Sequence, residues 1–282
     1  MVPSSQARAQ AFVGEAMRKV ARVRAIEIAY EDEGRGRPVV LLHGFPFNRS
    51  LWREQAESLG ASCRVVAPDL RGHGETSVVA GPATMEEMAE DLAALLDELG
   101  VGRAVVGGLS MGGYVALAFL RAYPERVGAL VLADTRAQAD TDDARRAREE
   151  TARRALSDGM GPIAGMMLPK LLAPATREGR PDLVARVRGM ILGTKPEGAA
   201  AALRGMAQRR DQTDLLETIR VPTLIIVGSE DVLTPPADSE AMHAKIEGSR
   251  LVKIEGAGHV SNLERPGEFG RALAQFLGGL PS

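Results

Sequence analysis

The 282-residue chain has one cysteine, few aromatic residues (4%) and almost no net charge. The lone Cys63 excludes an intramolecular disulfide and a cysteine-based metal site, and it fits a reducing compartment. Because Cys63 precedes an apolar run at 65–67, we expect a buried thiol rather than a reactive one. With 35 Lys and Arg against 37 Asp and Glu, the formal charge is −2. The composition therefore gives no electrostatic reason to expect nucleic acid or anionic lipid as a partner.

Long hydrophobic runs are also missing, so we expect no segment that spans a membrane. Residues 1–22 carry charged side chains where a secretory signal needs an apolar stretch. We therefore expect a cytoplasmic protein with no membrane partner. Four apolar residues of this extension share one helical face, which predicts a short helix packed on the body of the protein: Val13, Ala16, Met17 and Val20.

Strand-like and helix-like patterns alternate beyond residue 22, which predicts an α/β fold with a mostly parallel, doubly wound sheet. The clearest helix is 84–99, where Thr84 and Glu87 form a capping box and Gly100 supplies the stop. Further helices are expected at 51–59, 114–120 and 262–276. Short apolar runs predict strands at 23–31, 39–42, 64–67, 104–107, 127–133, 223–227 and 250–254.

The composition changes between residues 136 and 220. Strand-like runs vanish there, the segment 140–154 is highly charged, and several prolines divide the remainder into short pieces. This pattern predicts a helical cap inserted into the fold. We expect an N-terminal extension of residues 1–22, an α/β core of residues 23–135 and 221–282, and a helical cap of residues 136–220.

Ser110 stands in Gly108-Leu-Ser-Met-Gly112, between a strand-like run and a helix-like run. Gly-x-Ser-x-Gly in this setting is typical of a nucleophile elbow, a tight turn that exposes the serine hydroxyl. Gly108 and Gly112 have a physical role, because side chains there would collide with the neighbouring strand and helix. The pentapeptide alone recurs by chance, so its strand–helix context carries the prediction that Ser110 is a nucleophile.

A serine hydroxyl needs a histidine to take its proton and a carboxylate to hold that histidine. His259 follows the last predicted strand, so its loop is expected at the sheet edge that also carries Ser110. Asp231 follows the preceding strand and is the expected acid. Glu230, its neighbour, and Asp134, after an earlier strand, remain alternatives.

The negative charge that develops during acyl transfer needs two backbone N–H donors. Met111, directly after the nucleophile, is expected to supply one, and Phe45 is expected to supply the other. Pro46 has no N–H and is excluded. His43 and Gly44 are expected to support this oxyanion-hole loop rather than to react.

Five motifs stand in this order along the chain: His43–Pro46, Pro68–Gly74, Gly108–Gly113, Gly228–Asp231 and Gly258-His259. Together they resemble the α/β-hydrolase superfamily across residues 23–282, and the resemblance implies its fold and a Ser-Asp-His triad. Among its members, Gly-Leu-Ser-Met-Gly-Gly and His-Gly-Phe-Pro are similar to small bacterial carboxylesterases, the 3-oxoadipate enol-lactonase group and cofactor-free haloperoxidase/perhydrolases.

These features predict a serine hydrolase that cleaves carboxylic esters of small to medium acyl chains through an acyl-enzyme on Ser110. Lactone opening and perhydrolysis are the alternative reactions, and the small-molecule partner is an ester or lactone. A binding protein without turnover is disfavoured, because no triad member and no elbow glycine is missing.

We expect no metal and no cofactor, because the four histidines are scattered and no helix carries His-x-x-x-His. A monomer or a homodimer is expected. Arg209 and Arg210 are suited to bind a substrate carboxylate, although solvation or pairing with Asp211 and Asp214 is the expected arrangement.

Overall fold

A computed structural model describes residues 19–281, and its centre is one eight-stranded sheet in the order β1-β2-β4-β3-β5-β6-β7-β8. The pairs β1–β2 and β2–β4 are antiparallel and all other neighbours are parallel, which confirms the mostly parallel sheet. The strands are β1 Lys19–Val23, β2 Ile26–Gly34, β3 Arg37–Leu42, β4 Cys63–Pro68, β5 Ala104–Leu109, β6 Val127–Ala133, β7 Thr223–Gly228 and β8 Arg250–Ile254.

Strands β1 and β2 correct two predictions. One strand was expected at 23–31, but the chain turns at Arg24, which has a φ of 54°, and forms a hairpin. A helix was expected across residues 1–22, and it is wrong for 19–22, which belong to β1. Ala21 and Val23 are buried there while their neighbours face outward, so the two-residue period of a strand applies. Residues 1–18 of the predicted helix lie outside the described residues.

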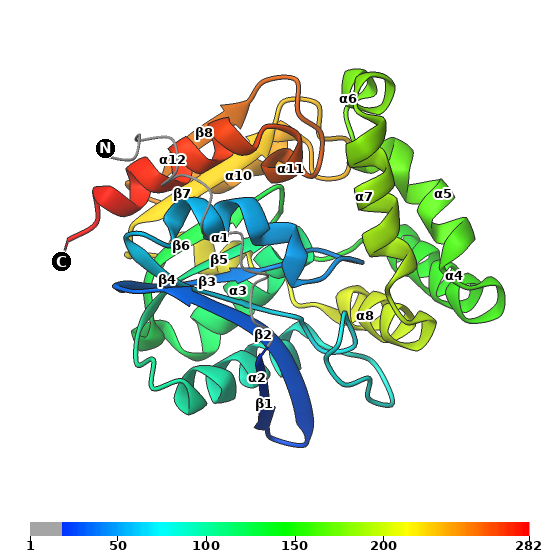
Figure 1. Ribbon diagram of the computed structural model, residues 1–282, viewed down its shortest axis with the longest axis horizontal. Coiled ribbons are helices and arrows are strands. Elements are labelled where there is room, and N and C mark those ends of the chain that lie inside the picture. The colour runs from blue at the N-terminus through cyan, green and yellow to red at the C-terminus, as the bar shows by residue number, and fades with distance from the viewer. Residues whose placement is uncertain (1–18, 282) are drawn as a thin grey trace, which may run out of the picture.

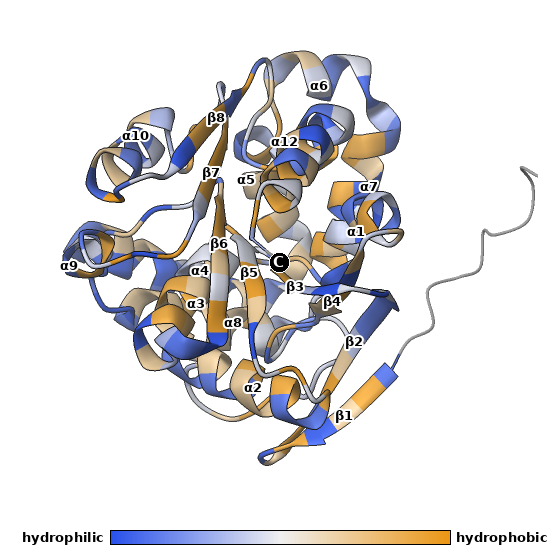
Figure 2. Cartoon of the chain, turned by 90° about the vertical axis from the view of Figure 1, so that its left-hand side faces the viewer, coloured by the Kyte–Doolittle hydropathy of each residue, from blue (hydrophilic) through white to orange (hydrophobic). Residues whose placement is uncertain are grey.

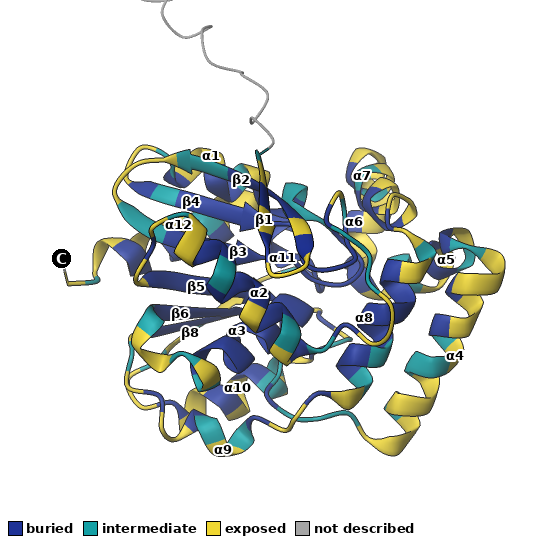
Figure 3. Ribbon diagram, turned by 90° about the horizontal axis from the view of Figure 1, so that it is seen from below, coloured by how far each residue is buried: buried dark blue, intermediate teal, exposed yellow. Residues whose placement is uncertain are grey.

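Helices cover both faces of the sheet, as Figure 2 shows. Helices α1 (Arg53–Leu59) and α12 (Pro266–Gly278) lie on one face, and α2 (Met85–Glu98), α3 (Met111–Ala122) and α10 (Pro236–Lys245) lie on the other. Every residue of β5 (Figure 3) and of β7 is buried, as expected for central strands covered on both sides. The remaining short helices outside the segment between β6 and β7 are η2 (Arg49–Trp52), η3 (Pro124–Arg126) and α11 (Ser261–Glu264).

Two local predictions for this core are confirmed. At α2, the Glu87 N–H donates to Thr84 Oγ1 at 3.2 Å and the Thr84 N–H donates to Glu87 Oε2 at 3.0 Å, which is the capping box. Cys63 is buried and has no disulfide. Within residues 19–281 no helix combines the length and apolarity that a membrane crossing requires.

The chain between β6 and β7 is helical and stands at one end of the sheet (Figure 1). Proline occupies the first turn of three of these helices, where its missing N–H costs nothing, so it divides the segment there as expected. Pro169, in contrast, lies inside a helix. We call α4 to α8 the inserted helices; the short α9 follows them. Their bounds are α4 Asp142–Asp158, α5 Met160–Leu171, α6 Pro174–Gly179, α7 Pro181–Leu192, α8 Pro196–Gln208 and α9 Thr213–Leu216.

Helix α8 fastens the inserted helices to the core. A Cβ at Gly198 would overlap the carbonyl oxygen of Gly72, and a Cβ at Gly205 would overlap that of Ala83, so backbone packs directly on backbone. The Ala83 N–H also donates to the Ala201 carbonyl at 2.9 Å. The inserted helices therefore rest on the loop that connects β4 to α2.

Candidate active site

Ser110 sits in a strained turn between β5 and α3. Its φ of 55° and ψ of −115° are unusual for a residue with a side chain, and such strain is typical of functional positions. A Cβ at Gly108 would overlap the backbone of Gly112, and a Cβ at Gly112 would overlap the Leu42 carbonyl. The Thr135 hydroxyl donates to the Ser110 carbonyl at 2.8 Å and secures the turn. The elbow thus forms because both glycines permit close contact.

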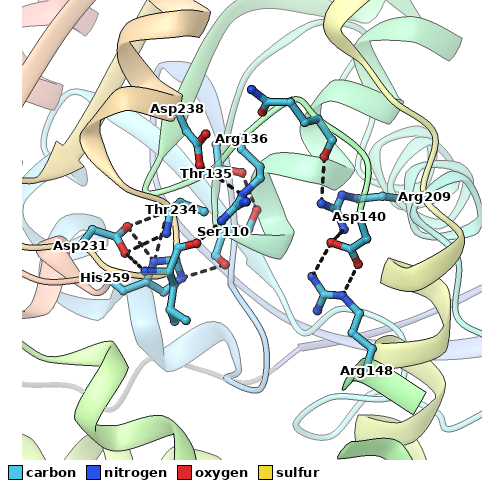
Figure 4. Close-up of polar contacts among 12 residues, drawn as sticks. Ser110, Thr135, Arg136, Asp140, Arg148, Arg209, Asp231, Thr234, Asp238 and His259 are labelled. Atoms are coloured by element: carbon cyan, nitrogen blue, oxygen red, sulfur yellow. Dashed lines mark hydrogen bonds and ion pairs between the residues drawn. The ribbon is translucent and has the colours of Figure 1, made fainter. Parts of the chain in front are cut away.

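Three side chains from three loops form one hydrogen-bonded line (Figure 4). The distance from Ser110 Oγ to His259 Nε2 is 2.8 Å, and the distance from His259 Nδ1 to Asp231 Oδ2 is also 2.8 Å. Since the Asp231 carboxylate only accepts, Nδ1–H donates to it and Nε2 is left to accept from the serine hydroxyl. The structure thus brings the expected nucleophile, base and acid into contact.

Thr234 completes the surroundings of Asp231. Its hydroxyl donates to Asp231 Oδ2 at 2.6 Å, and the N–H groups of Leu233 and Thr234 donate to Oδ1 at 2.8 and 3.0 Å. Burial acts to raise the pKa of Asp231, but the His259 ring and these donors outweigh it and lower that pKa below its usual range. Sequence reasoning missed Thr234; its position three residues after the expected acid was the available signal.

The two alternative acids have other positions. Asp134 accepts from the Gly228 N–H at 2.8 Å and from the Ser261 hydroxyl at 2.6 Å, and the described residues show no hydrogen bond from it to His259. Burial, with the nearby charge of Asp231, raises the pKa of Asp134 well above its usual range. The side chain of Glu230 is exposed. Asp134 therefore joins the ends of β6 and β7 to α11.

The loop that begins at His43 lies against the elbow. A Cβ on Gly44 would come within 3.2 Å of Ser110 Cβ, a tight contact that glycine avoids. Within residues 19–281 the structure shows no acceptor for the backbone N–H of Phe45 or of Met111. The Met111 N–H belongs to the first turn of α3, where helix N–H groups are unpaired and favour negative charge.

His43 holds this loop in place as a neutral ring. Its Nδ1–H donates to the Gly44 carbonyl at 2.9 Å, and its Nε2 accepts from the Leu70 N–H at 2.9 Å. Burial lowers the pKa of His43 to about 4. The similarly buried His73 has its pKa lowered to about 3, by burial first and by the neighbouring His43 second. Neither ring forms a hydrogen bond with Ser110, which fits the expectation that His43 supports the loop rather than reacts.

Glu264, which sequence reasoning also missed, joins the histidine loop to the inserted helices. Its carboxylate accepts from the Gly258 N–H at 2.7 Å and from the Ala173 N–H at 3.0 Å. The His259 N–H donates to the Leu171 carbonyl at 3.0 Å. The helix expected at 262–276 is interrupted at Arg265. The short α11 thereby turns Glu264 into the interior, where it is 2% exposed.

A cavity of about 340 Å³ opens above the Ser110 hydroxyl. The core contributes Phe45, Ser110 and His259 to its wall, and the inserted helices contribute most of the remainder. Apolar lining residues include Met166, Met167, Leu203 and Met206. Among residues 19–281 no three His, Cys, Asp or Glu side chains cluster as metal ligands would.

Comparison with known proteins places the chain in a family. Residues 37–266 match the model of the alpha/beta hydrolase fold family. The chain is 31% identical over 230 residues to a 3-oxoadipate enol-lactonase of Acinetobacter baylyi, covering 82% of this chain and 84% of that one. The chain therefore belongs to the α/β-hydrolase family.

Two solved structures are similar over nearly the whole molecule. A thermophilic esterase from Thermogutta terrifontis, solved with malate bound, superposes with a TM-score of 0.92 at 45% identity and covers 95% of this chain and 100% of that one. The enol-lactonase from Burkholderia xenovorans superposes with a TM-score of 0.87 at 30% identity, covering 92% of this chain and 100% of that one. Both the resemblance and the fold class expected from the motifs are confirmed.

Proposed function

We propose that this α/β-hydrolase cleaves esters of small to medium acyl chains through an acyl-enzyme on Ser110. The protein is a carboxylic ester hydrolase, like the esterase and lactonases to which it is similar. The observation that carries the proposed mechanism is the hydrogen-bonded line Ser110–His259–Asp231, which ends at the floor of the cavity.

In the proposed first half-reaction, Ser110 Oγ attacks the ester carbonyl carbon while His259 Nε2 takes the hydroxyl proton. Asp231 stabilises the imidazolium that forms. The backbone N–H groups of Phe45 and Met111 bind the oxyanion, which is supported by their lack of other acceptors within residues 19–281. The intermediate then expels the alcohol, and His259 returns the proton to the leaving oxygen.

In the second half-reaction, water replaces the alcohol. The water oxygen attacks the acyl carbon while His259 takes a proton from that water. His259 then returns the proton to Ser110 Oγ when the carboxylic acid leaves. Every proton is thus transferred through His259 Nε2. A lactone would react by the same steps, but its leaving alcohol stays tethered to the acyl group.

The proposed limit on acyl length rests on the inserted helices. We propose that residues 136–220 act as a cap over Ser110, because helices from this segment supply most of the cavity wall. A volume of about 340 Å³ is near the lower end of the range for small-molecule sites, which favours short substrates. Monomer or homodimer, a cytoplasmic location and the absence of a cofactor stay predictions.

Initial rates on p-nitrophenyl esters from C2 to C16, on γ-lactones and on acyl-homoserine lactones test this proposal. We expect kcat/KM to peak at C2 to C8, and we expect rapid mixing to reveal a burst of p-nitrophenol when deacylation is slower than acylation. Faster turnover of C16 than of C4 esters would contradict the size limit alone. Slow uniform release with no acylated Ser110 in mass spectra would contradict the acyl-enzyme.

A further inference from the structure

The cavity wall above Ser110 carries an excess of positive charge. Three cationic side chains line it, Arg136, Arg148 and Lys170, against the single carboxylate of Asp140. Ser110 and His259 lie on one side of the view in Figure 4, and Arg148 and Asp140 lie on the other. A cavity for an unsubstituted alkyl ester has no use for such charges.

The carboxylate of Asp140 does not neutralise the positive charge of the cavity wall, because two guanidiniums share it. Arg148 pairs with it through Nε and through Nη2, the latter 3.3 Å from Oδ1, while Arg209 Nη1 lies 2.6 Å from Oδ1. Arg148 and Arg209 lower the pKa of Asp140 despite its burial, so the carboxylate is ionised. This cluster of one anion and two cations keeps one positive charge.

Arg209 is the structural member of that pair. It is 4% exposed, its Nη2 donates to the Gln138 carbonyl at 2.8 Å, and its guanidinium stacks 4.3 Å above the Tyr114 ring. The expectation that Arg209 is solvated or paired with Asp211 is thus wrong. Arg210, in contrast, pairs with Asp214 at 3.3 Å as expected. The residue of the cluster that reaches the cavity is Arg148.

Arg148, which lines the cavity, retains hydrogen-bonding capacity. Its Nε–H and one N–H on each terminal nitrogen are engaged by Asp140 and by the Met206 sulfur. A guanidinium has five N–H groups, so two remain for a ligand. The side chain is 22% exposed and lies on the cavity wall.

Lys170 and Arg136 differ in their partners. Within residues 19–281 the structure shows no hydrogen bond or ion pair for the Lys170 ammonium, which lines the cavity from α5. Arg136 is already matched, since its Nε lies 3.3 Å from Asp238 and its Nη2 donates to the Leu233 carbonyl. Asp231 lies behind the His259 ring and is not part of the wall. Arg148 and Lys170 are therefore the two unmatched charges.

We propose that Arg148 and Lys170 bind a carboxylate on the substrate, so that the site selects monoesters of dicarboxylic acids or lactones that bear a carboxylate. This inference rests on the proposed ester hydrolysis and names its substrate class. A guanidinium and an ammonium recognise a carboxylate by charge-assisted hydrogen bonds. The methionine and leucine side chains of the wall suit the carbon chain between that carboxylate and the reacting carbonyl.

The test compares monomethyl glutarate with dimethyl glutarate, which differ at one end only, by pH-stat titration of released acid. We expect wild-type kcat/KM to be at least about tenfold higher for the monoester, and this ratio to shrink in 0.5 M NaCl because salt screens the contact. Equal rates for the two substrates at low salt would overturn the proposal.

Two variants locate the effect. Arg148→Gln is expected to lower the monoester-to-diester ratio by about tenfold, and Lys170→Gln, at an exposed position, by about threefold. Arg146→Gln is the matched control, because Arg146 lies on the same helix, is 71% exposed and is not in the cavity wall. Ratios in both Arg148→Gln and Lys170→Gln that match the control would refute the assignment.

A binding measurement separates this inference from the proposed hydrolysis. Calorimetry with glutarate, which has no ester bond, is expected to show binding to wild-type protein that weakens severalfold in Lys170→Gln. Glutarate binding without turnover of any ester would keep the anion site and reject the proposed hydrolysis. Turnover of neutral esters, with neither glutarate binding nor a preference for the monoester, would keep the proposed hydrolysis and reject the anion site. Because Lys170 is exposed, its variant remains informative even if Arg148→Gln fails to fold.

Discussion

Two regions of the molecule are held together by different kinds of contact. One is the set of loops at the carboxyl ends of the parallel strands, which we call the sheet edge, and the other is the inserted helices. At the sheet edge, the line from Ser110 to Asp231 is held by backbone contact at Gly108 and Gly112 and by hydrogen bonds to buried groups. The inserted helices carry paired charges, including Arg148 with Asp140 and Arg204 with Glu149. Much of their surface is exposed, as α4 in Figure 3 illustrates.

This difference separates two tasks. The inserted helices contribute no atom to the hydrogen-bonded line of Ser110, His259 and Asp231, yet they form most of the cavity wall. We infer that the residues of the sheet edge carry out the reaction and that the inserted helices determine which substrates are accepted. Changes at the sheet edge should then lower kcat for every ester, whereas changes in the inserted helices should alter preference or stability.

The largest effect is expected for Ser110→Ala. Without the hydroxyl no acyl-enzyme forms, and ester turnover should fall by at least about 10³-fold while thermal unfolding stays close to that of the wild type. Ser157→Ala, on the exposed face of α4, is the control and should keep full activity. A Ser110→Ala protein with a tenth of the wild-type rate would end the serine-hydrolase proposal.

Asp231→Asn should come next. The amide cannot stabilise the imidazolium and favours the wrong tautomer of His259, so kcat should fall by about 10²- to 10⁴-fold. Asp134→Asn is the matched comparison, because Asp134 follows the neighbouring strand but bonds Gly228 and Ser261. Its kcat should fall far less. A reversed order of the two variants would assign the acid role to Asp134.

Acid should destabilise the core through its neutral histidines. In the unfolded chain these rings titrate near 6.5, whereas in the fold the pKa of His43 is about 4 and that of His73 about 3. Below pH 6.5 the unfolded state binds more protons, so stability is lost as pH falls toward 4. His73 alone accounts for roughly 2–3 kcal/mol of this loss. Urea unfolding at pH 7 and pH 4.5 should show a smaller loss for His73→Asn than for the wild type; equal losses would contradict the buried neutral ring.

Alanine at two glycines of the inserted helices should have opposite effects. Gly205→Ala forces a methyl group into the Ala83 carbonyl and should cost about 1–3 kcal/mol of unfolding free energy. Gly189→Ala, within α7, meets nothing within 4 Å and should stabilise by about 0.5–1 kcal/mol. Chemical denaturation measures both. Similar effects of the two changes would show that α8 does not rest on the core as described.

A moderate effect on both stability and kcat is expected for Glu264→Gln, at the junction of the two regions. The amide nitrogen cannot accept, so one of the N–H groups of Gly258 and Ala173 loses its acceptor at a cost of about 1–3 kcal/mol. Because the same contact holds the loop of His259, kcat should also decrease severalfold. Glu268→Gln, exposed on α12, is the control. Unchanged melting temperature and kcat in Glu264→Gln would exclude this positioning role.

The elbow was predictable because its signal is local. Gly108, Ser110 and Gly112 occupy five consecutive residues, and the strand before them and the helix after them are visible in the sequence. His259 and Asp231 were placed by one further rule, that loops after parallel strands meet at one edge of the sheet. The mostly parallel sheet follows from its apolar runs, which need burial on both faces.

The sequence by itself determined that the sheet is mostly parallel, where the elbow lies and the order of Ser110, Asp231 and His259, because those features depend on short patterns. Only the tertiary structure decided that residues 19–22 form a strand, that Thr234 supports Asp231, and that Glu264 joins the histidine loop to Ala173. It also paired Arg209 with Asp140 instead of leaving it in solvent. Each of these depends on a partner or a burial that the local pattern does not encode, since hydrogen bonds and ion pairs are set by distance in space rather than separation along the chain.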